Sequence, residues 1–256
     1  MEVSVEGRPS VSYWGATKSA TYGFIAALPL FLLYEVLILL VNGGRANQIR
    51  VGADVWIKQL LSVFGTYAMT ALAILVLIIG VTVFVHERKK KIPIRFNFLG
   101  WLIGESAVYA IIVAFLVSAV VGLIFSMDLG SLHVGMVQGQ EAEAPGMFMM
   151  VVLSIGAGLY EELIFRVVLV GSLSWVLYHW MGNKTAAYVV SALVGALIFS
   201  AVHYVGALGD AFTLSSFTFR FLFGLALNGI FLVRGFGVAA WTHALYDVLV
   251  VTHLLG

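Results

Sequence analysis

Polar residues that could do chemistry interrupt long apolar stretches in the second half of the sequence. An ionisable side chain near the centre of a bilayer costs about 2.5–3.5 kcal/mol on insertion scales. Such residues are therefore expected to pair with one another or to face a water-filled cavity, as they do at functional sites. The residues in question are Glu161, Glu162, Arg166, His203, His243 and Asp247.

Helical spacing predicts which of the residues Glu161, Glu162 and Arg166 contact each other. Glu162 and Arg166 are four residues apart, so they share one helix face with the acid on the N-terminal side, which favours an internal ion pair. Glu161 points about 100° away from Glu162. It has no partner on its own helix, and it is free to face a cavity.

The two histidines also sit in pairs. His243 and Asp247 are four residues apart, so the carboxylate can accept a hydrogen bond from the imidazole and fix its tautomer. Phe199 and His203 repeat the same spacing, which stacks a ring against the second histidine.

These residue types suit the hydrolysis of an acyl bond. A carboxylate that loses solvation becomes a better base near neutral pH. A neighbouring imidazole can orient a water molecule, and a second imidazole can stabilise a tetrahedral oxyanion, which contributes about 2.7–4 kcal/mol. The sequence therefore predicts that Glu161, His203 and His243 form a catalytic site.

The three groups resemble the motifs of the CAAX-protease and bacteriocin-processing family, called CPBP or Abi. The similarity lies in Glu161-Glu162-xxx-Arg166, Phe199-xxx-His203 and His243-xxx-Asp247, over roughly residues 147–254. It implies a glutamate-type intramembrane protease of the Ras-converting kind, without an essential metal.

The resemblance also implies a role for each residue. Glu161 would be the general base, and His203 would hold the same water. Glu162 and Arg166 would support the charge of the site, and His243 with the residue at 247 would form the oxyanion pocket. The family often has asparagine where this chain has Asp247, and an ionised aspartate cannot donate to an oxyanion. Asp247 is therefore either protonated or an orienter of His243.

Three rival functions remain open. The two glutamates and two histidines could ligate zinc, although the sequence has no HExxH helix. Intramembrane charges also mark transporters and proton relays, but no inverted repeat is visible. The family also includes proteins proposed as immunity factors or scaffolds, in which binding replaces cleavage.

Composition places the chain in a membrane. Of 256 residues, 61% are hydrophobic and 11% charged, with a mean hydropathy of +1.03. Soluble domains are about one quarter charged, and a membrane helix needs about 20 apolar residues. We expect a single all-α domain, a polytopic bundle of about seven or eight spans. The core is expected over 147–254, with additional N-terminal spans over 1–146. The expected spans are Thr21–Val41, Thr66–Val85, Phe98–Phe125, Met147–Leu169, Thr185–Val205, Phe217–Val233 and Phe236–Leu254.

Smaller features complete this picture. A stretch near Val55–Val63 is expected in the interface, and Ser172–Gly182 is expected to form a turn and an interfacial helix. Glu35 and Glu105 are expected to reach the interface in structural roles. Glu161 and His243 are expected about 13 Å and 10 Å from the cytoplasmic side. His203 fits that depth only if its span continues past Val205.

Charge predicts the topology. The segment from Arg88 to Arg95 is rich in Lys and Arg, which places it in the cytoplasm. The acidic loop Met127–Gly146 then lies outside, although Arg45, Arg50 and Lys58 argue mildly for the reverse.

The expected partners follow from these features. They are the lipid bilayer and a peptide or protein substrate at the membrane, with no nucleic acid. The expected location is a bacterial inner membrane. Zero cysteines exclude disulfides and thiolate sites, and neither the substrate nor the oligomeric state follows from the sequence.

Overall fold

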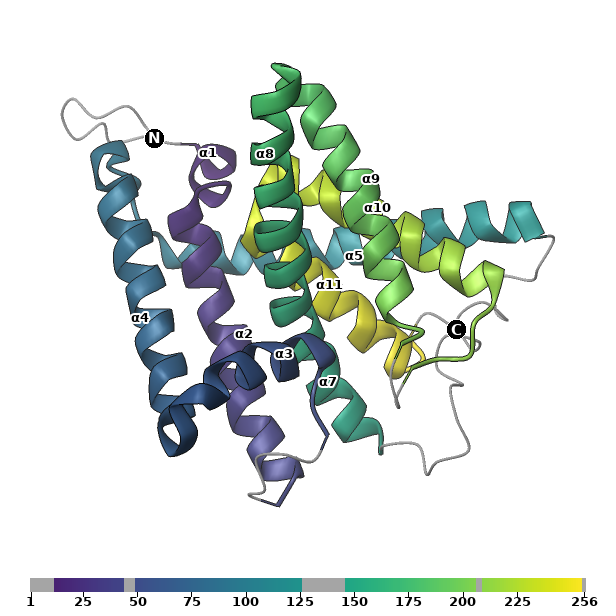
Figure 1. Ribbon diagram of the computed structural model, residues 1–256, viewed down its shortest axis with the longest axis horizontal. Helices are drawn as coiled ribbons and strands as arrows, with labels where there is room; N and C mark the ends of the chain where they lie inside the picture. The colour runs from purple at the N-terminus through teal and green to yellow at the C-terminus, as the bar shows by residue number, and fades with distance from the viewer. Residues whose placement is uncertain (1–11, 44–48, 126–145, 206–208, 255–256) are drawn as a thin grey trace, which may run out of the picture.

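The computed structural model describes residues 12–43, 49–125, 146–205 and 209–254 (Figure 1). Within these ranges the chain forms helices and turns with no strand, which confirms the predicted all-α fold. The expected acidic loop, including Asp128, Glu141 and Glu143, lies almost wholly outside the described residues, and so does Arg45. No observation tests the division between 1–146 and 147–254.

The N-terminal half begins with two helices that are capped by serines. Ser12 accepts a hydrogen bond from the backbone of Gly15, and Ser19 does the same for Tyr22. Such caps satisfy amide groups that the first helical turn leaves unpaired. The elements of this half are α1 (Tyr13–Thr17), α2 (Ala20–Val41), α3 (Gly52–Leu61), the 3-10 segment η1 (Ser62–Tyr67), α4 (Ala68–Glu87), the 3-10 turn η2 (Arg88–Lys90) and α5 (Phe96–Phe125).

The C-terminal half carries the predicted site residues. Asn183 and Thr213 cap two of its helices by accepting hydrogen bonds from the backbones of Ala186 and Ser216. Gly182 adopts a positive φ of 65°, which ends one helix and lets the chain reverse. The elements are α7 (Met147–Glu162), the π-helical segment η3 (Leu163–Val170), α8 (Gly171–Met181), α9 (Lys184–Val202), α10 (Leu214–Arg234) and α11 (Phe236–Val251).

Six helical stretches of the described chain are long and apolar enough to cross a membrane, and α11 is a shorter apolar helix. They match the expected spans to within a few residues at most ends. Large apolar side chains such as Leu77, Leu116 and Phe115 are exposed on the outside of these helices. An exposed apolar surface of this extent needs lipid to cover it, and the chain is an integral multi-pass membrane protein.

The segment Ser172–Gly182 differs from its prediction. The structure has no turn before it, because α7, η3 and α8 form one continuous helical stretch from Met147 to Met181. The π-helical segment absorbs an extra residue without ending the helix. The aromatic residues of this segment thus extend the membrane helix itself.

Close helix packing sets the geometry of the centre. Helix α11 packs chiefly against α7 and α5, and α10 packs against α9. At Gly158 of α7, an added Cβ atom would lie 2.5 Å from the Ala244 Cβ and 2.6 Å from the Ala240 carbonyl oxygen. Glycine therefore allows α7 and α11 to approach at the level of the predicted site, as small residues do in membrane bundles.

The two ends of the bundle can be told apart in Figure 1. The top of the view holds the end of α4, which leads into Arg88–Lys91, and the turn between α8 and α9. We call this the basic end. The bottom holds α3, the end of α2 and the start of α7, and we call it the opposite end.

Candidate active site

The structure brings the predicted site residues together from three helical stretches. Glu161 and Glu162 end α7, and Arg166 follows in η3. Phe199 lies near the end of α9 with His203 just beyond it, while His243 and Asp247 lie on α11. The pairs that helical spacing predicted are all in contact.

Glu161 faces His203. The Glu161 Oε2 atom lies 3.9 Å from His203 Nε2, and the two side chains are 16% and 25% exposed. His203 Nδ1 lies 2.7 Å from the Phe199 carbonyl oxygen. A carbonyl oxygen can only accept, so Nδ1 carries the proton and Nε2 is left as an acceptor. Glu161 Oε2 has no hydrogen-bond donor among the described residues.

Glu162 contacts both Arg166 and His243. Its Oε1 atom lies 2.9 Å from Arg166 Nη1 and 2.8 Å from His243 Nδ1, and all three side chains are buried. The contact with Arg166 was predicted from spacing. The contact with His243 was not, because spacing along one helix says nothing about a partner on another.

The Arg166 guanidinium is held by charge more than by hydrogen bonds. None of its nitrogens makes a well-aligned hydrogen bond with a described residue. The group lies 4.6 Å from the centre of the Phe199 ring, a cation–π contact. The Phe199 ring thus contacts Arg166 as well as the two histidines.

Asp247 lies on the other side of His243. Its Oδ2 atom is 3.4 Å from His243 Nε2, and its side chain is 28% exposed. The imidazole is therefore flanked by Glu162 at Nδ1 and by Asp247 at Nε2. Glu162, with the shorter contact, is the partner that orients the ring.

Aromatic rings pack around both histidines. The Phe199 ring lies 4.9 Å from His203 and 6.0 Å from His243. Phe223 of α10 lies 5.3 Å from His243 and 4.4 Å from Tyr246. The prediction missed Phe223 and Tyr246, because an apolar pattern does not distinguish a ring beside a site from any other core residue.

The helix ends around His203 and Glu161 differ from their prediction. Helix α9 ends at Val202 and does not continue past Val205, so His203 lies at the end of the helix far from Lys184. Glu161 is about 21 Å along the helix from Met147 and about 30 Å from Met181. Along this helical stretch Glu161 is therefore nearer to the opposite end, while His243 lies about 10 Å from Phe236 at the start of α11, the distance that the sequence predicted.

Glu35 and Glu105 both form ion pairs within the protein, and their expected position at the interface stays a prediction. Glu35 is 8% exposed and lies 2.7 Å from Lys58 of α3 and 2.5 Å from the Tyr160 hydroxyl. Glu105 lies 2.5 Å from Arg234 Nε. Their predicted structural role agrees with these contacts, and the Glu35 contacts attach α3 to the residue before Glu161.

Helix α3 lies beside the site as well. Lys58 and Arg50 both pair with Asp54, at 2.6 Å and 2.7 Å. The exposed Trp56 ring lies 6.4 Å from Phe165 in η3. The stretch expected in the interface is thus an amphipathic helix that covers part of η3.

No group of three or more His, Asp or Glu residues in the described chain is arranged to hold a metal ion. The expectation of a reaction without zinc stays a prediction, since nothing tests it.

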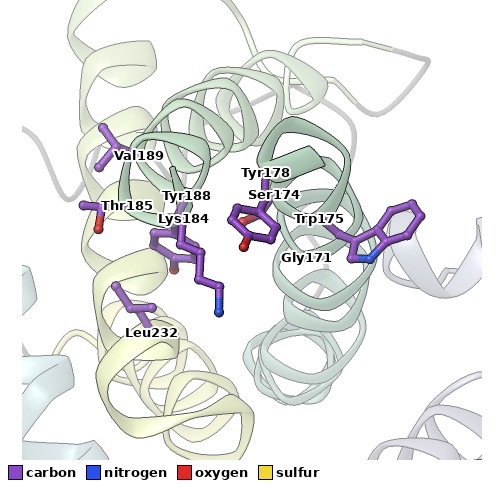
Figure 2. A pocket seen from close by; sticks show the side chains of 9 residues that line it. All are labelled: Gly171, Ser174, Trp175, Tyr178, Lys184, Thr185, Tyr188, Val189 and Leu232. Carbon is purple, nitrogen blue, oxygen red and sulfur yellow. The ribbon is translucent and has the colours of Figure 1, made fainter. Parts of the chain in front are cut away.

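A cavity of about 480 Å³ opens between α8, α9 and α10, away from these residues (Figure 2). Figure 2 shows the Lys184 amine and the Tyr178 hydroxyl directed into the space, while the Trp175 ring points away from it. The Lys184 amine lies 5.4 Å from the Tyr178 ring centre. None of the described residues that line the cavity belongs to the predicted site.

Comparison with known families adds one finding. Residues 143–249 match a family model described as "Type II CAAX prenyl endopeptidase Rce1-like". The matched range contains every residue of the predicted site. No curated protein and no solved structure matched the chain.

Proposed function

We propose that this chain, which carries a domain of the Rce1-like CAAX-protease family over residues 143–249, hydrolyses peptide bonds within the membrane by means of a water activated by Glu161 and His203. The family supports a membrane protease of the CAAX type in general. The residue roles, the absence of a metal in the reaction and the substrate are parts of this proposal.

The separation of Glu161 and His203 carries the proposal. Two acceptor atoms, Glu161 Oε2 and His203 Nε2, face each other at 3.9 Å. That distance is too long for a direct hydrogen bond, and neither atom could donate in this protonation state. One water at about 2.8 Å from each atom can donate one hydrogen to each. Its lone pairs then point away from both acceptors, toward an incoming carbonyl carbon.

The proposed reaction balances on these groups. The water oxygen forms a bond to the carbonyl carbon while its proton passes to Glu161, and the carbonyl oxygen becomes an oxyanion. Collapse of this intermediate breaks the C–N bond, and the proton on Glu161 passes to the leaving nitrogen. Glu161 returns to its ionised form.

His243 is the proposed donor to the oxyanion. Glu162 accepts from Nδ1–H, which fixes the ring, and an N–H at Nε2 points toward the side of Asp247. Asp247 can support the proton on Nε2, or it can donate to the oxyanion itself when protonated.

The proposed substrate is a membrane-associated peptide or protein with a C-terminal signal, cleaved in a bacterial inner membrane. The name of the family refers to CAAX prenyl substrates, which makes a prenylated C-terminus one member of this class. The site is partly open at Glu161, His203 and Asp247, so an extended segment can reach it.

Replacement of Glu161 by glutamine tests the proposal. The change keeps the shape of the side chain and removes the base, and we expect cleavage to fall about 100-fold or more. The substrate is found by comparing the C-termini of membrane proteins in cells that express the wild type and the E161Q variant. His179→Gln is the matched control, since His179 is exposed and bonds only its own helix.

The other outcomes are also informative. Full cleavage by a folded E161Q variant would overturn the proposal. Unchanged function in cells without any cleavage would favour a scaffold, and loss of wild-type cleavage on addition of a chelator would favour a zinc enzyme.

A further inference from the structure

Arg220 is a buried cation of α10 that the sequence motifs do not include. Its side chain is 11% exposed, and it has three partners. Nη1 donates to the Tyr204 hydroxyl at 2.8 Å and to the Ser216 hydroxyl at 2.5 Å, and Nη2 pairs with the Asp210 carboxylate. A buried arginine with this many polar partners is held in one orientation.

The helix alone does not fix His203. It follows Val202, the last residue of α9, and its amide makes a long hydrogen bond of 3.4 Å to the Ser200 carbonyl. Its own carbonyl accepts from the Asp210 amide at 2.8 Å. The segment after the helix therefore contributes to the position of the histidine.

Arg220 holds this segment at two points. Tyr204 directly follows His203, and Asp210 is the residue whose amide bonds the His203 carbonyl. Arg220 bonds the side chains of both. One turn further along α10, Phe223 contacts the His243 ring, and an added Cβ at Gly224 would lie 3.1 Å from Phe199. The arginine thus lies on the part of α10 that borders the site.

We infer that Arg220 is a positioning residue, which holds His203 with Nε2 directed at Glu161 and contributes, beside burial, to the neutral state of the imidazole. This inference rests on the proposed function, because the neutral Nε2 is the atom that accepts from the water. Arg220 itself does not touch the reacting atoms.

The charges around His203 support the proposed effect of Arg220 on the protonation of the imidazole. The charged groups around His203 are Glu161 from α7, Arg166 from η3, Arg220 from α10, His243 from α11 and the Asp210 carboxylate, which pairs with Arg220. His203 lies one residue beyond the span Lys184–Val202. Burial lowers the pKa of His203 below its usual range, and the charge of Arg220 is the next cause. The hydrogen bond to the Phe199 carbonyl acts in the other direction.

Two variants separate the effect of the hydrogen bonds of Arg220 from the effect of its charge. Arg220→Met removes both, while Arg220→Lys keeps the charge and loses the ability to bridge Tyr204 and Asp210. Arg95→Met is the control, since Arg95 is an exposed cation that lies outside the site. Each full-length variant is purified in detergent micelles, and the His203 ring is titrated by NMR of labelled histidine, assigned with a His203→Gln variant.

We expect the His203 midpoint to rise by about one pH unit or more in Arg220→Met, and to stay near the wild-type value in Arg220→Lys and Arg95→Met. We also expect kcat on a fluorogenic farnesylated CAAX-type peptide to fall at least 10-fold in both Arg220 variants, with KM little changed. An unchanged midpoint in Arg220→Met, or full kcat in folded Arg220→Lys, would overturn the inference.

The titration needs no catalysis, which separates this inference from the proposed function. If E161Q cleaves normally while the His203 midpoint moves in Arg220→Met, the proposed function fails and the effect of Arg220 on His203 stands. If E161Q is inactive and no Arg220 variant moves the midpoint or kcat, the inference alone fails.

Discussion

Asp247 is the residue whose chemistry fits the proposed reaction least easily. Its Oδ2 atom lies at the Nε2 side of His243, where a developing oxyanion would approach. An ionised carboxylate at that place repels the oxyanion and competes for the same N–H. An amide of the same shape would offer a donor instead.

We therefore expect Asp247→Asn to raise kcat several-fold. Rates of peptide cleavage by the purified variants measure this, and Asp247→Ala serves as the control that lacks both the charge and the donor. A lower rate for Asp247→Asn than for the wild type would instead show that the carboxylate is needed to hold the proton on His243.

Glu162 has two cationic neighbours, and their loss is expected to be costly. Arg166→Met leaves Glu162 buried with only His243 as a partner. Breaking a buried pair on one side typically costs about 3–5 kcal/mol. We expect that loss in the free energy of unfolding, measured by denaturant titration in micelles.

A double-mutant cycle refines this prediction. The Glu162→Gln, Arg166→Met pair should cost less than the sum of the two single changes, because neither charge is then left alone. Lys89→Met, at an exposed lysine, should change the free energy of unfolding by less than about 0.5 kcal/mol. Strict additivity would mean that the two residues do not stabilise each other.

At the scale of the elements, what could be predicted depended on whether the information lay within one helix. The spacing of Glu162 with Arg166 and of His243 with Asp247 gave contacts that the structure contains. The helices themselves followed from long apolar runs. A contact within one helix can be predicted from the helical period alone, because residues three or four positions apart in the sequence lie on the same face.

Features that depend on packing between elements could not be predicted. The contact of Glu162 with His243 depends on the approach of α7 and α11 at Gly158. The continuation of α7 into α8 depends on a π-helical segment, and a run of apolar residues does not indicate where such a segment forms. The role of Arg220 could not be predicted from its helix, because two of its three partners, Tyr204 and Asp210, lie outside that helix.

Gly158→Ala tests whether the close packing of α7 against α11 is needed for stability and activity. The new methyl group would meet the Ala244 backbone nitrogen at 2.5 Å, and backbone atoms cannot move aside without shifting a helix. We expect a loss of about 1–3 kcal/mol in the free energy of unfolding and a larger loss of kcat than of stability, because Glu162 and His243 would separate.

Gly104→Ala in α5 is the matched control. An added Cβ there meets nothing within 4 Å, so the variant should be neutral or slightly more stable. Equal stability and rate for Gly158→Ala and wild type would mean that α7 and α11 are free to move apart.

At the scale of the whole molecule, the position of the site and the distribution of charge together predict which side of the membrane the site faces. His203 directly follows the end of α9, and Asp247 lies four residues before the end of α11. Both helices start toward the basic end and run away from it. The basic end carries Arg88 and three lysines in a row. The described cations of the opposite end, Arg50 and Lys58, both pair with Asp54.

The positive-inside rule then gives a testable orientation. The basic end should face the cytoplasm, and the site should open toward the other side of the membrane. Because the chain has no cysteine, each introduced cysteine is the only thiol. We expect Gln59→Cys, on α3, to react with a membrane-impermeant maleimide in intact cells. Lys89→Cys and Lys184→Cys should react only after lysis.

The orientation also selects the class of substrate. With the expected labelling, the site faces exported segments, and cytoplasmic C-termini cannot reach it without crossing the bilayer. The opposite labelling would place Glu161 and His203 nearer to the cytoplasm, and a C-terminally modified cytoplasmic protein would become the favoured substrate. Labelling of Gln59→Cys and Lys89→Cys from the same side would contradict the span assignment of α4, since Gln59 lies on α3 before the start of α4 and Lys89 follows its end.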